Sequence, residues 1–534
     1  MIKPNEARLS SMIENAEEIS NSHTPIQVTS AKPRLHVDSC NPDRTLADLR
    51  AILASNSELF DRGGPVRLIK DPETGQLVAS RLTADNVVLL THQVSRPWSI
   101  KKRQDGLQVV DTWLPKSFAN MYIEWTGEWH LLPLGGITSA PIIKRDGTIV
   151  YNAGYDQETC VYLSADVDIA DRIPEHPTKE DSSNAIRVLR QQLETFCFAD
   201  APTTSVPGSD IEQVDLSKPP GDDETAAIAA LLTAVARSSL DRAPAFLYGA
   251  PSISGAVAGK RLLVKCICQI AFGQAPYAVT AGENAQELEK RIAAELMASN
   301  PVLFLDNLND TALRSNLLAS ALTEKYARAR ILGKSEMVPL RTSAFVVLTG
   351  NGLSVSEDLA RRIIEIEFDP RTEDPEARRF PTDLYTNTQR DRLTLLAAAL
   401  TILRWGLQQE QLASGRPLGS FEQWCQWVRD PLLELGCRDP VERMSRAKHR
   451  DPRRQQISEI FEAWHRRHGT KAVLANELHD EVRQLLDPHK RGRQYVVSRL
   501  KQLEGTRIGG FMLLRECSKG KWSKNRYILD RLTD

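Results

Sequence analysis

The pattern of apolar and polar positions divides the 534-residue chain into regions of different character. Residues 1–34 are polar, and we expect a flexible leader there. From residue 35 to 205, short apolar runs alternate with turn signals such as "DPETGQ" and "KRDGT", which favours an N-terminal α+β accessory domain. In this region we expect strands at 65–71, 86–90, 121–125 and 147–152, and a helix at 183–198.

A different alternation follows a Pro- and Ser-rich linker at 206–223. Short, continuous apolar runs bounded by turn signals predict buried strands, and longer periodic runs between them predict helices. The expected strands are 245–249, 277–280, 301–306 and 344–350, the helices 223–236, 260–272, 284–298 and 310–325, and a hairpin spans 327–340. This order indicates an α/β core at 224–375 with a parallel sheet covered on both faces.

Helical patterns dominate from 376 to 450, where we expect a helical lid or connector. The last region, 451–534, shows three further helical patterns at 455–469, 474–486 and 493–504. Two strand patterns joined by a Gly- and Lys-rich turn follow them. Three helices and a hairpin in this order predict a C-terminal winged helix.

Composition adds limits to this picture. With 41% hydrophobic and 26% charged residues the chain has the balance of a globular protein, and its longest apolar run, 393–403, is too short to cross a bilayer. The N-terminus has no secretory or transit pattern, so we expect no membrane association and a cytoplasmic location. The eight cysteines show no C-x-x-C pair or zinc spacing, which favours reduced thiols over a structural metal.

Charge is distributed unevenly. The net charge is -1, yet residues 441–534 hold 22 Lys/Arg against 12 Asp/Glu, which leaves residues 1–440 at -11. A charged segment is often only a solvated face. A basic module on an acidic protein nevertheless favours a nucleic-acid partner.

The stretch "SGAVAGKR" carries the first candidate chemistry. It follows a predicted strand and opens a predicted helix, which is the setting of the phosphate-binding pattern G-x-x-x-x-G-K-[ST]. Gly255, Gly259 and Lys260 fit such a loop, whereas Ser254 stands at the first glycine and Arg261 at the magnesium-binding hydroxyl. Alone, the match also fits an ordinary Gly/Ser loop before a helix.

Two later strands end in polar residues. "VLFLDN" delivers Asp306 and "VVLTGN" delivers Asn351. Because parallel strands present their carboxyl ends at one edge of the sheet, both side chains should lie beside the phosphate loop. There a carboxylate would face the metal and an amide would orient water. The alternative for Asp306 is a buried strand followed by a helix cap.

An arginine pair, Arg361 and Arg362, precedes the next apolar strand, in "DLARRIIEIEFD". Arginine stabilises the charge that develops on a transferred phosphoryl group. A surface arginine pair on a short helix is the alternative.

With these words in this order, residues 245–370 resemble the AAA+ replicative helicases and primase-helicases of phages, plasmids and integrative elements, which have superfamily 3-like or MCM-like ATPase modules. The stretch 133–163, "PLGGITSAPIIKRDGTIVYNAGYDQETCVYL", is similar to the segment that precedes such ATPases. The resemblance implies a P-loop AAA+ fold, a homo-oligomeric ring and the cofactors ATP and Mg²⁺.

The resemblance also implies residue roles. Lys260 would bind phosphate, Asp306 would face magnesium, Asn351 would be the polar sensor, and Arg361 or Arg362 would reach a neighbouring subunit. Lys334, in the hairpin turn, would point into a central DNA channel, although an exposed turn lysine fits as well. Asn307 stands where many ATPases have a glutamate base, so the base is unnamed here, with Asp310 and Glu324 as guesses.

The predicted winged helix offers a second DNA contact, although such modules also dock proteins. We expect phosphate or base contacts from a basic set on the third helix, its approach and the wing: Arg491, Arg493, Arg499, Lys501, Lys519, Lys521 and Lys524. The sequence thus predicts an ATP-dependent DNA helicase or translocase for replication of a mobile element, working with a separate primase or polymerase. The alternative is an ATP-binding initiator or DNA-binding regulator with weak or no hydrolysis.

Overall fold

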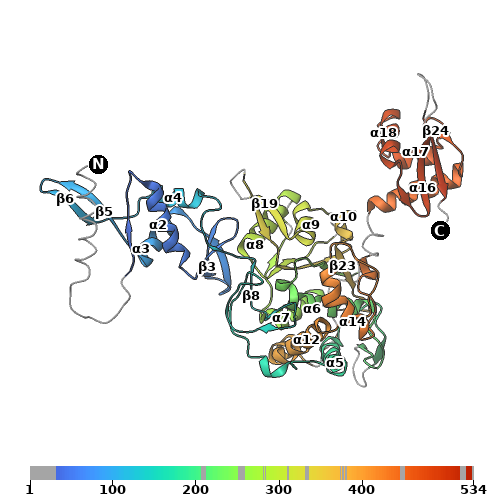
Figure 1. The fold of residues 1–534 in the computed structure, drawn as a ribbon. Coiled ribbons are helices and arrows are strands. Elements are labelled where there is room, and N and C mark those ends of the chain that lie inside the picture. Colours follow the sequence, from blue (N-terminus) through green and yellow to red (C-terminus); the bar gives the residue numbers. More distant parts are fainter. Residues whose placement is uncertain are drawn as a thin grey trace.

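The computed structural model describes residues 32–205, 212–250, 259–280, 284–309, 312–330, 336–372, 382–444, 452–516 and 525–531, with residues 282, 375, 378 and 380. Figure 1 shows three bodies in chain order: a blue N-terminal part, a rounded central body and a red C-terminal unit. The central body contains the candidate chemistry.

A five-stranded, wholly parallel sheet forms the centre of this body. The strand order is β16, β17, β21, β15, β23, so the strand before the candidate phosphate loop lies inside the sheet. The strands are β15 (Ala245–Ala250), β16 (Ala278–Val279), β17 (Val302–Leu305), β21 (Phe345–Asn351) and β23 (Ile363–Glu367). The prediction of a parallel α/β core is confirmed.

Helices cover both faces of the sheet, because alternate strand residues point to opposite sides. Phe246 and Tyr248 of β15 pack into one core, and Ala245 and Leu247 into the other. The first core contains α5 (Lys179–Leu193), α6 (Asp222–Ala236), α7 (Lys260–Phe272) and α12 (Arg392–Leu407). The second contains α8 (Ala285–Ala298), α9 (Asn316–Thr323) and the antiparallel hairpin β19 (Tyr326–Arg330) with β20 (Met337–Arg341).

Two expectations in this region differ from the structure. The helix expected at 310–325 is the shorter α9, because Ser315 accepts a hydrogen bond from the Leu318 amide and starts the helix there. Before it, β18 (Ala312–Leu313) pairs with β22 (Ser354–Val355). The expected linker 206–223 is partly strand, since β14 (Glu212–Val214) pairs with β13 (Thr203–Ser205).

From residue 32 onward, the N-terminal part combines small sheets with helices. Its longer elements are α2 (Pro42–Ala54), β3 (Pro65–Lys70), β4 (Leu77–Arg81), α3 (Ala84–Val94), β5 (Arg96–Arg103), β6 (Gly106–Asp111) and α4 (Lys116–Glu124). Its short strands are β1 (Arg34–His36), β2 (Leu59–Asp61), β7 (Leu132–Pro133), β8 (Gly136–Thr138), β9 (Ile142–Ile143), β10 (Ile149–Val150), β11 (Gly154–Asp156) and β12 (Val161–Leu163). The strands expected at 86–90 and 121–125 are wrong, because residues 86–90 lie in α3 and residues 121–124 in α4.

Packing groups the segment from Ala140 onward with the central sheet. Ile143, Ile149 and the apolar face of α5 share one core with α6 and α12. The helices between residues 35 and 131 have a separate core, built around Leu49, Val87 and Tyr122, and the sheet of β2, β3 and β4 has a smaller one with Phe60 and Val66. The domain boundary at residue 205 stays a prediction.

Arg62 links the N-terminal part to the central body. Its side chain is buried and donates to five backbone carbonyls. Those of Leu296 and Met297 lie at the carboxyl end of α8, where the helix dipole favours a cation. The carbonyl of Arg341 lies at the end of β20. Burial, and the charge of Arg341 after it, lower the pKa of Arg62 to about 10.

A buried ion cluster joins the helical segment after residue 382 to the central body. The remaining helices of this segment are α11 (Leu384–Arg390), α13 (Glu422–Trp424), a π-helical turn (Cys425–Arg429) and α14 (Asp430–Glu434). Beyond them, Arg443 lies 2.6 Å from Asp200 and 2.7 Å from Asp223. Asp200 also accepts from the first amides of α6. Burial raises the pKa of Asp223 to about 8, even against this arginine.

The C-terminal unit has α16 (Pro452–His468), α17 (Asp480–Leu486) and α18 (Arg493–Leu503) around one apolar core. The unit also has a four-stranded sheet, in the order β24 (Val473–Leu474), β27 (Arg526–Arg531), β26 (Phe511–Glu516), β25 (Arg507–Ile508). The second expected helix starts later than predicted, because Val473 and Leu474 pair with β27.

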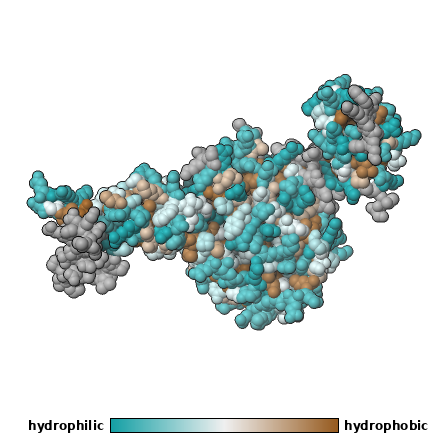
Figure 2. Space-filling model, turned by 45° about the horizontal axis from the view of Figure 1, so that its top comes forward, coloured by the Kyte–Doolittle hydropathy of each residue, from teal (hydrophilic) through white to brown (hydrophobic). Residues whose placement is uncertain are grey.

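The visible surface is mostly hydrophilic, with hydrophobic residues in small scattered groups (Figure 2). Within the described part of the chain, we find no helix with the length and apolar character needed to cross a bilayer.

Candidate functional site

Lys260 opens α7 directly after the candidate phosphate loop. Gly259 precedes it with φ +88°, a backbone conformation that glycine adopts without strain. A Cβ atom at Gly259 would also lie 3.5 Å from the ring of Phe196. Ser254 and Gly255 lie outside the described residues. The described end of the loop thus places a lysine at the N-terminus of a 13-residue helix, where backbone amides point outward.

The structure brings Lys260 to the carboxyl edge of the neighbouring strand β21. Its Nζ atom donates to Asn351 Oδ1 at 2.5 Å. Burial lowers the pKa of Lys260, and the nearby Cys197 and Asp306 oppose this shift. The lysine is therefore held in a partly desolvated position at the end of the sheet, where its charge is less screened than in water.

Asp306 lies at the same edge, one residue beyond β17. Thr349 Oγ1 donates to Asp306 Oδ1 at 2.5 Å and accepts from the Asn307 amide at 3.0 Å. Gly350 allows this close packing, because a Cβ atom there would meet the Leu308 carbonyl oxygen at 2.6 Å. The loop after β17 is thus fixed against β21.

Sequence reasoning missed two residues of this arrangement. Thr349 was visible in "VVLTGN", but a local apolar run cannot show that its hydroxyl binds a carboxylate at the end of another strand. Asn309 accepts from the Asn351 amide through Oδ1 at 2.8 Å, and its Nδ2 donates to Asn307 at 2.5 Å. These asparagines tie the two strand ends together.

Arg261 occupies the remaining side of Asp306. Its Nε atom lies 3.4 Å from Asp306 Oδ2, and its side chain is 61% exposed. The described residues therefore offer a divalent ion one carboxylate with both oxygens engaged, and no hydroxyl at position 261. Mg²⁺ prefers several free oxygen ligands in octahedral geometry. In this arrangement the described donor set does not fit a magnesium ion.

The arginine pair lies away from this edge, before β23. Arg361 follows α10 (Glu357–Ala360), and both arginines pair with Asp358 of that helix. Arg361 is exposed, and Arg362 also donates to the Asp358 carbonyl at 2.7 Å. Within the described chain neither contacts Lys260 or Asp306. An exposed position is what contact with another subunit would require.

The two guessed bases give no further support. Glu324 follows α9 on the surface, and no contact in the described ranges joins it to Lys260 or Asp306. Asp310 lies outside the described residues.

The hairpin has one buried and one outward face. Ala327, Ala329 and Val338 pack into the second core. Tyr326 and Arg328 point outward from β19. Lys334, at the expected tip, lies outside the described residues. The outward face of the stem thus carries both an aromatic ring and positive charge.

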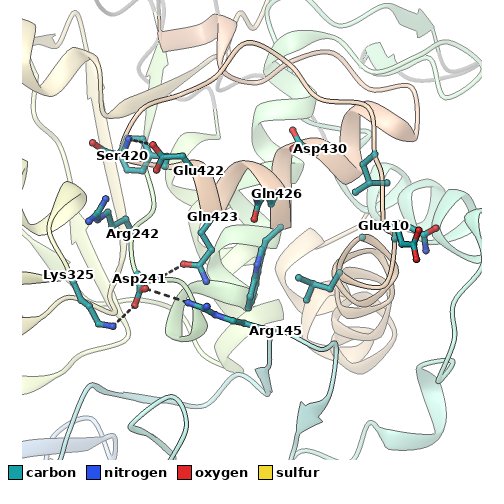
Figure 3. Close-up of a pocket in the computed structure, with 16 residues that line it drawn as sticks. Arg145, Asp241, Arg242, Lys325, Glu410, Ser420, Glu422, Gln423, Gln426 and Asp430 are labelled. Carbon is teal, nitrogen blue, oxygen red and sulfur yellow. Dashed lines mark hydrogen bonds and ion pairs between the residues drawn. The ribbon is translucent and has the colours of Figure 1, made fainter.

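A separate cavity of about 720 Å³ lies at the opposite, amino end of β15 (Figure 3). Asp241 lines it, with Lys325 at 3.3 Å and Arg145 at 3.8 Å. Arg341 lies 3.8 Å away, and the Asp241 amide donates to Gln423 at 2.9 Å. Lys325 directly precedes β19 and Arg341 ends β20, so both lie at the open end of the hairpin, and Asp241 holds this base.

The C-terminal unit presents several of the predicted basic residues on or before α18. Arg491 stacks on Tyr495, with 4.9 Å between the guanidinium carbon and the ring centre. Arg493 and Lys501 are exposed, whereas Arg499 is half-buried and donates to Gln502 at 3.4 Å. The three predicted wing residues Lys519, Lys521 and Lys524 lie outside the described residues.

No protein-family model and no curated protein matches this chain. Among solved structures, the apo C-terminal region of NrS-1 is 11% identical, with a TM-score of 0.32 over 63% of this chain and 84% of that one. The SCCmec type IV Cch active helicase is 11% identical, with a TM-score of 0.32 over 89% and 98%. JCV helicase is 12% identical, with a TM-score of 0.20 over 51% and 67%. These likenesses are too distant to assign a fold or an activity.

Proposed function

We propose that this chain is an ATP-dependent DNA helicase or translocase of the AAA+ type. The observation that carries this proposal is the meeting of Lys260, Asn351 and Asp306 at one edge of a parallel sheet. Ligands of such sheets bind beyond the carboxyl ends of the strands. A lysine and helix amides at that edge suit the outer phosphates of a nucleoside triphosphate.

In this proposal each residue has a defined task. The Lys260 ammonium and the first amides of α7 bind the phosphates. When nucleotide binds, the Asn351 side chain loses its hydrogen bond to Lys260 and forms one to a water molecule. It orients that water toward the γ-phosphorus. Thr349 holds the Asp306 carboxylate in place, and the low dielectric around the half-buried lysine strengthens these contacts.

The arginines Arg361 and Arg362 belong to a neighbouring subunit's site in this proposal. The exposure of Arg361, and the lack of a contact between either arginine and Lys260 within the described chain, support contact in trans. An arginine that stabilises the charge developing on the γ-phosphoryl group then requires a homo-oligomeric ring. Hydrolysis at each interface would move the hairpin and its Lys334 along single-stranded DNA.

The C-terminal unit completes the proposed motor. Three helices and an antiparallel sheet with exposed arginine and lysine on α18 suit a winged helix that binds duplex DNA. We place the activity in cytoplasmic replication of a mobile element, with a primase or polymerase as a separate partner. Residues 35–205 would be an accessory domain.

Turnover of ATP tests the nucleotide site. Lys260→Ala should lower the DNA-stimulated rate by about 100-fold or more, because it removes the charge nearest the transferred phosphoryl group. Lys265→Ala is the matched control, since it removes a lysine from the same helix outside the site. Turnover and its stimulation by single-stranded DNA would be measured for all three proteins. Unchanged stimulation in Lys260→Ala would refute the proposal.

One observation favours a second candidate function. The pairing of Arg261 with Asp306 suits a protein that binds ATP and hydrolyses it slowly or not at all. Such a protein would be a replication initiator or a DNA-binding regulator. Tight ATP binding by the wild type without turnover, in the presence or absence of DNA, would favour this alternative.

A further inference from the structure

Arg261 stands where the phosphate-loop pattern places the hydroxyl ligand of a magnesium ion. Its guanidinium lies against Asp306, the carboxylate that such an ion would share. The Arg261 guanidinium therefore occupies the position that a magnesium ion would take beside Asp306. A divalent ion could approach Asp306 only by displacing this arginine, since Thr349 already engages the other oxygen.

The geometry leaves Arg261 free to bind phosphate. Its contact with Asp306, from Nε to Oδ2, measures 3.4 Å, which exceeds an ordinary charge-assisted hydrogen bond. A guanidinium has five donors in a planar fork that matches phosphate oxygens. At 61% exposure the side chain is also free to turn toward a ligand at the start of α7.

Two consecutive cations span this edge of the sheet. Lys260 lies against Asn351 at the end of β21, and Arg261 lies against Asp306 beyond β17. Both belong to the first turn of α7, whose dipole adds positive potential. Two positive side chains and the helix amides oppose most of the negative charge of a β,γ-diphosphate group.

We infer that Arg261 substitutes for the divalent cation in nucleotide binding, so that this site takes up a nucleoside triphosphate without a metal. The inference rests on the proposed function, because it assumes that the edge binds nucleotide. In this inference Arg261 contacts phosphate oxygens directly, and Asp306 positions the Arg261 guanidinium near the nucleotide site before the nucleotide binds.

Equilibrium binding of a fluorescent ATP analogue, mant-ATP, to the full chain tests this inference. The Kd would be measured once in EDTA and once in MgCl₂. For the wild type we expect the two values to agree within about threefold. For Arg261→Thr, which restores the hydroxyl of the pattern, we expect binding in EDTA to weaken by about tenfold or more, the usual effect of losing a charge-assisted contact, and to recover in MgCl₂.

Two controls separate the outcomes. Lys265→Thr removes a charge from the same helix and should leave both Kd values unchanged. Equal melting temperatures would show that Arg261→Thr is folded. Wild-type binding that requires MgCl₂, or an unchanged EDTA-to-MgCl₂ ratio in Arg261→Thr, would overturn the inference alone. Absence of binding in both buffers would refute the nucleotide site itself.

Discussion

At the scale of single residues, the candidate site depends on the hydroxyl of Thr349, which holds the Asp306 carboxylate. Thr349 is buried, and its Oγ1 atom uses its donor on Asp306 and an acceptor site on the Asn307 amide. Asp306 is thereby fixed while one of its oxygens faces Arg261. The threonine is a positioning residue, whose effect passes through the carboxylate.

Thr349→Val should separate this role from simple packing. Valine keeps the shape but leaves a carboxylate oxygen and an amide without their partner, which costs about 1–3 kcal/mol in the free energy of unfolding. We expect a lower kcat with KM for ATP nearly unchanged, because phosphate binding by Lys260 remains. Urea unfolding and steady-state kinetics would measure the two effects.

Thr349→Ser is the matched control, since it retains the hydroxyl. A serine variant as impaired as the valine variant would show that the methyl group matters instead, and the positioning role would be wrong.

The sequence predicted the site residues, but not the side-chain contacts between them. The words "AGKR", "FLDN" and "LTGN" located Lys260, Asp306 and Asn351, because each polar residue directly follows an apolar strand or a glycine turn. The contacts of Thr349 with Asp306 join positions 43 residues apart. No local pattern encodes such a pair, since the pairing is set by strand order.

At the scale of elements, the central sheet was predictable and the N-terminal helices were not. Strands of the sheet are continuous apolar runs, because they are buried on both faces. Residues 86–90 and 121–125 show similar short runs, yet they lie within longer helices. The signal that was overlooked is the capping box of α3, in which Thr83 and Asn86 exchange hydrogen bonds.

Arg62 shows how one side chain can hold two elements from different parts of the chain. It caps the carboxyl end of α8 and contacts the last residue of β20. Arg62→Ala would leave several buried carbonyls without a donor, and we expect the free energy of unfolding to fall by about 3 kcal/mol or more. Urea unfolding would measure this loss.

Limited proteolysis of Arg62→Ala adds a readout specific to the link. Cleavage should become faster between the N-terminal part and the central body, and the central body should survive. Arg67→Ala is the control, because that arginine pairs with Glu58 on the surface. Equal cleavage of both variants would contradict the linking role of Arg62.

At the scale of the whole molecule, opposite charges are separated along the chain. The C-terminal unit holds the positive excess, and α18 presents Arg493 and Lys501 to solvent. Proteins that neutralise DNA phosphates release counterions, so their affinity falls with salt in proportion to the number of contacts. The unit would therefore dominate the salt dependence of duplex binding.

The double variant Arg493→Ala/Lys501→Ala tests this expectation. The slope of log K against log salt concentration should become shallower by about two, one for each lost phosphate contact. Fluorescence anisotropy of a labelled duplex over a salt series would measure it. Arg466→Ala/Arg467→Ala is the control, because both arginines are paired with Glu481 and should change the slope less. Equal slopes in the wild type and in Arg493→Ala/Lys501→Ala would exclude α18 from the interface.

The contacts of Arg62 determine how pH and ionic strength affect the attachment of the N-terminal part to the central body. All five acceptors of that guanidinium are neutral peptide carbonyls. Low pH therefore protonates no carboxylate in these contacts, and salt screens no ion pair in them. Changes in ionic strength that would weaken the proposed binding to DNA should therefore leave the contact between the N-terminal part and the central body intact.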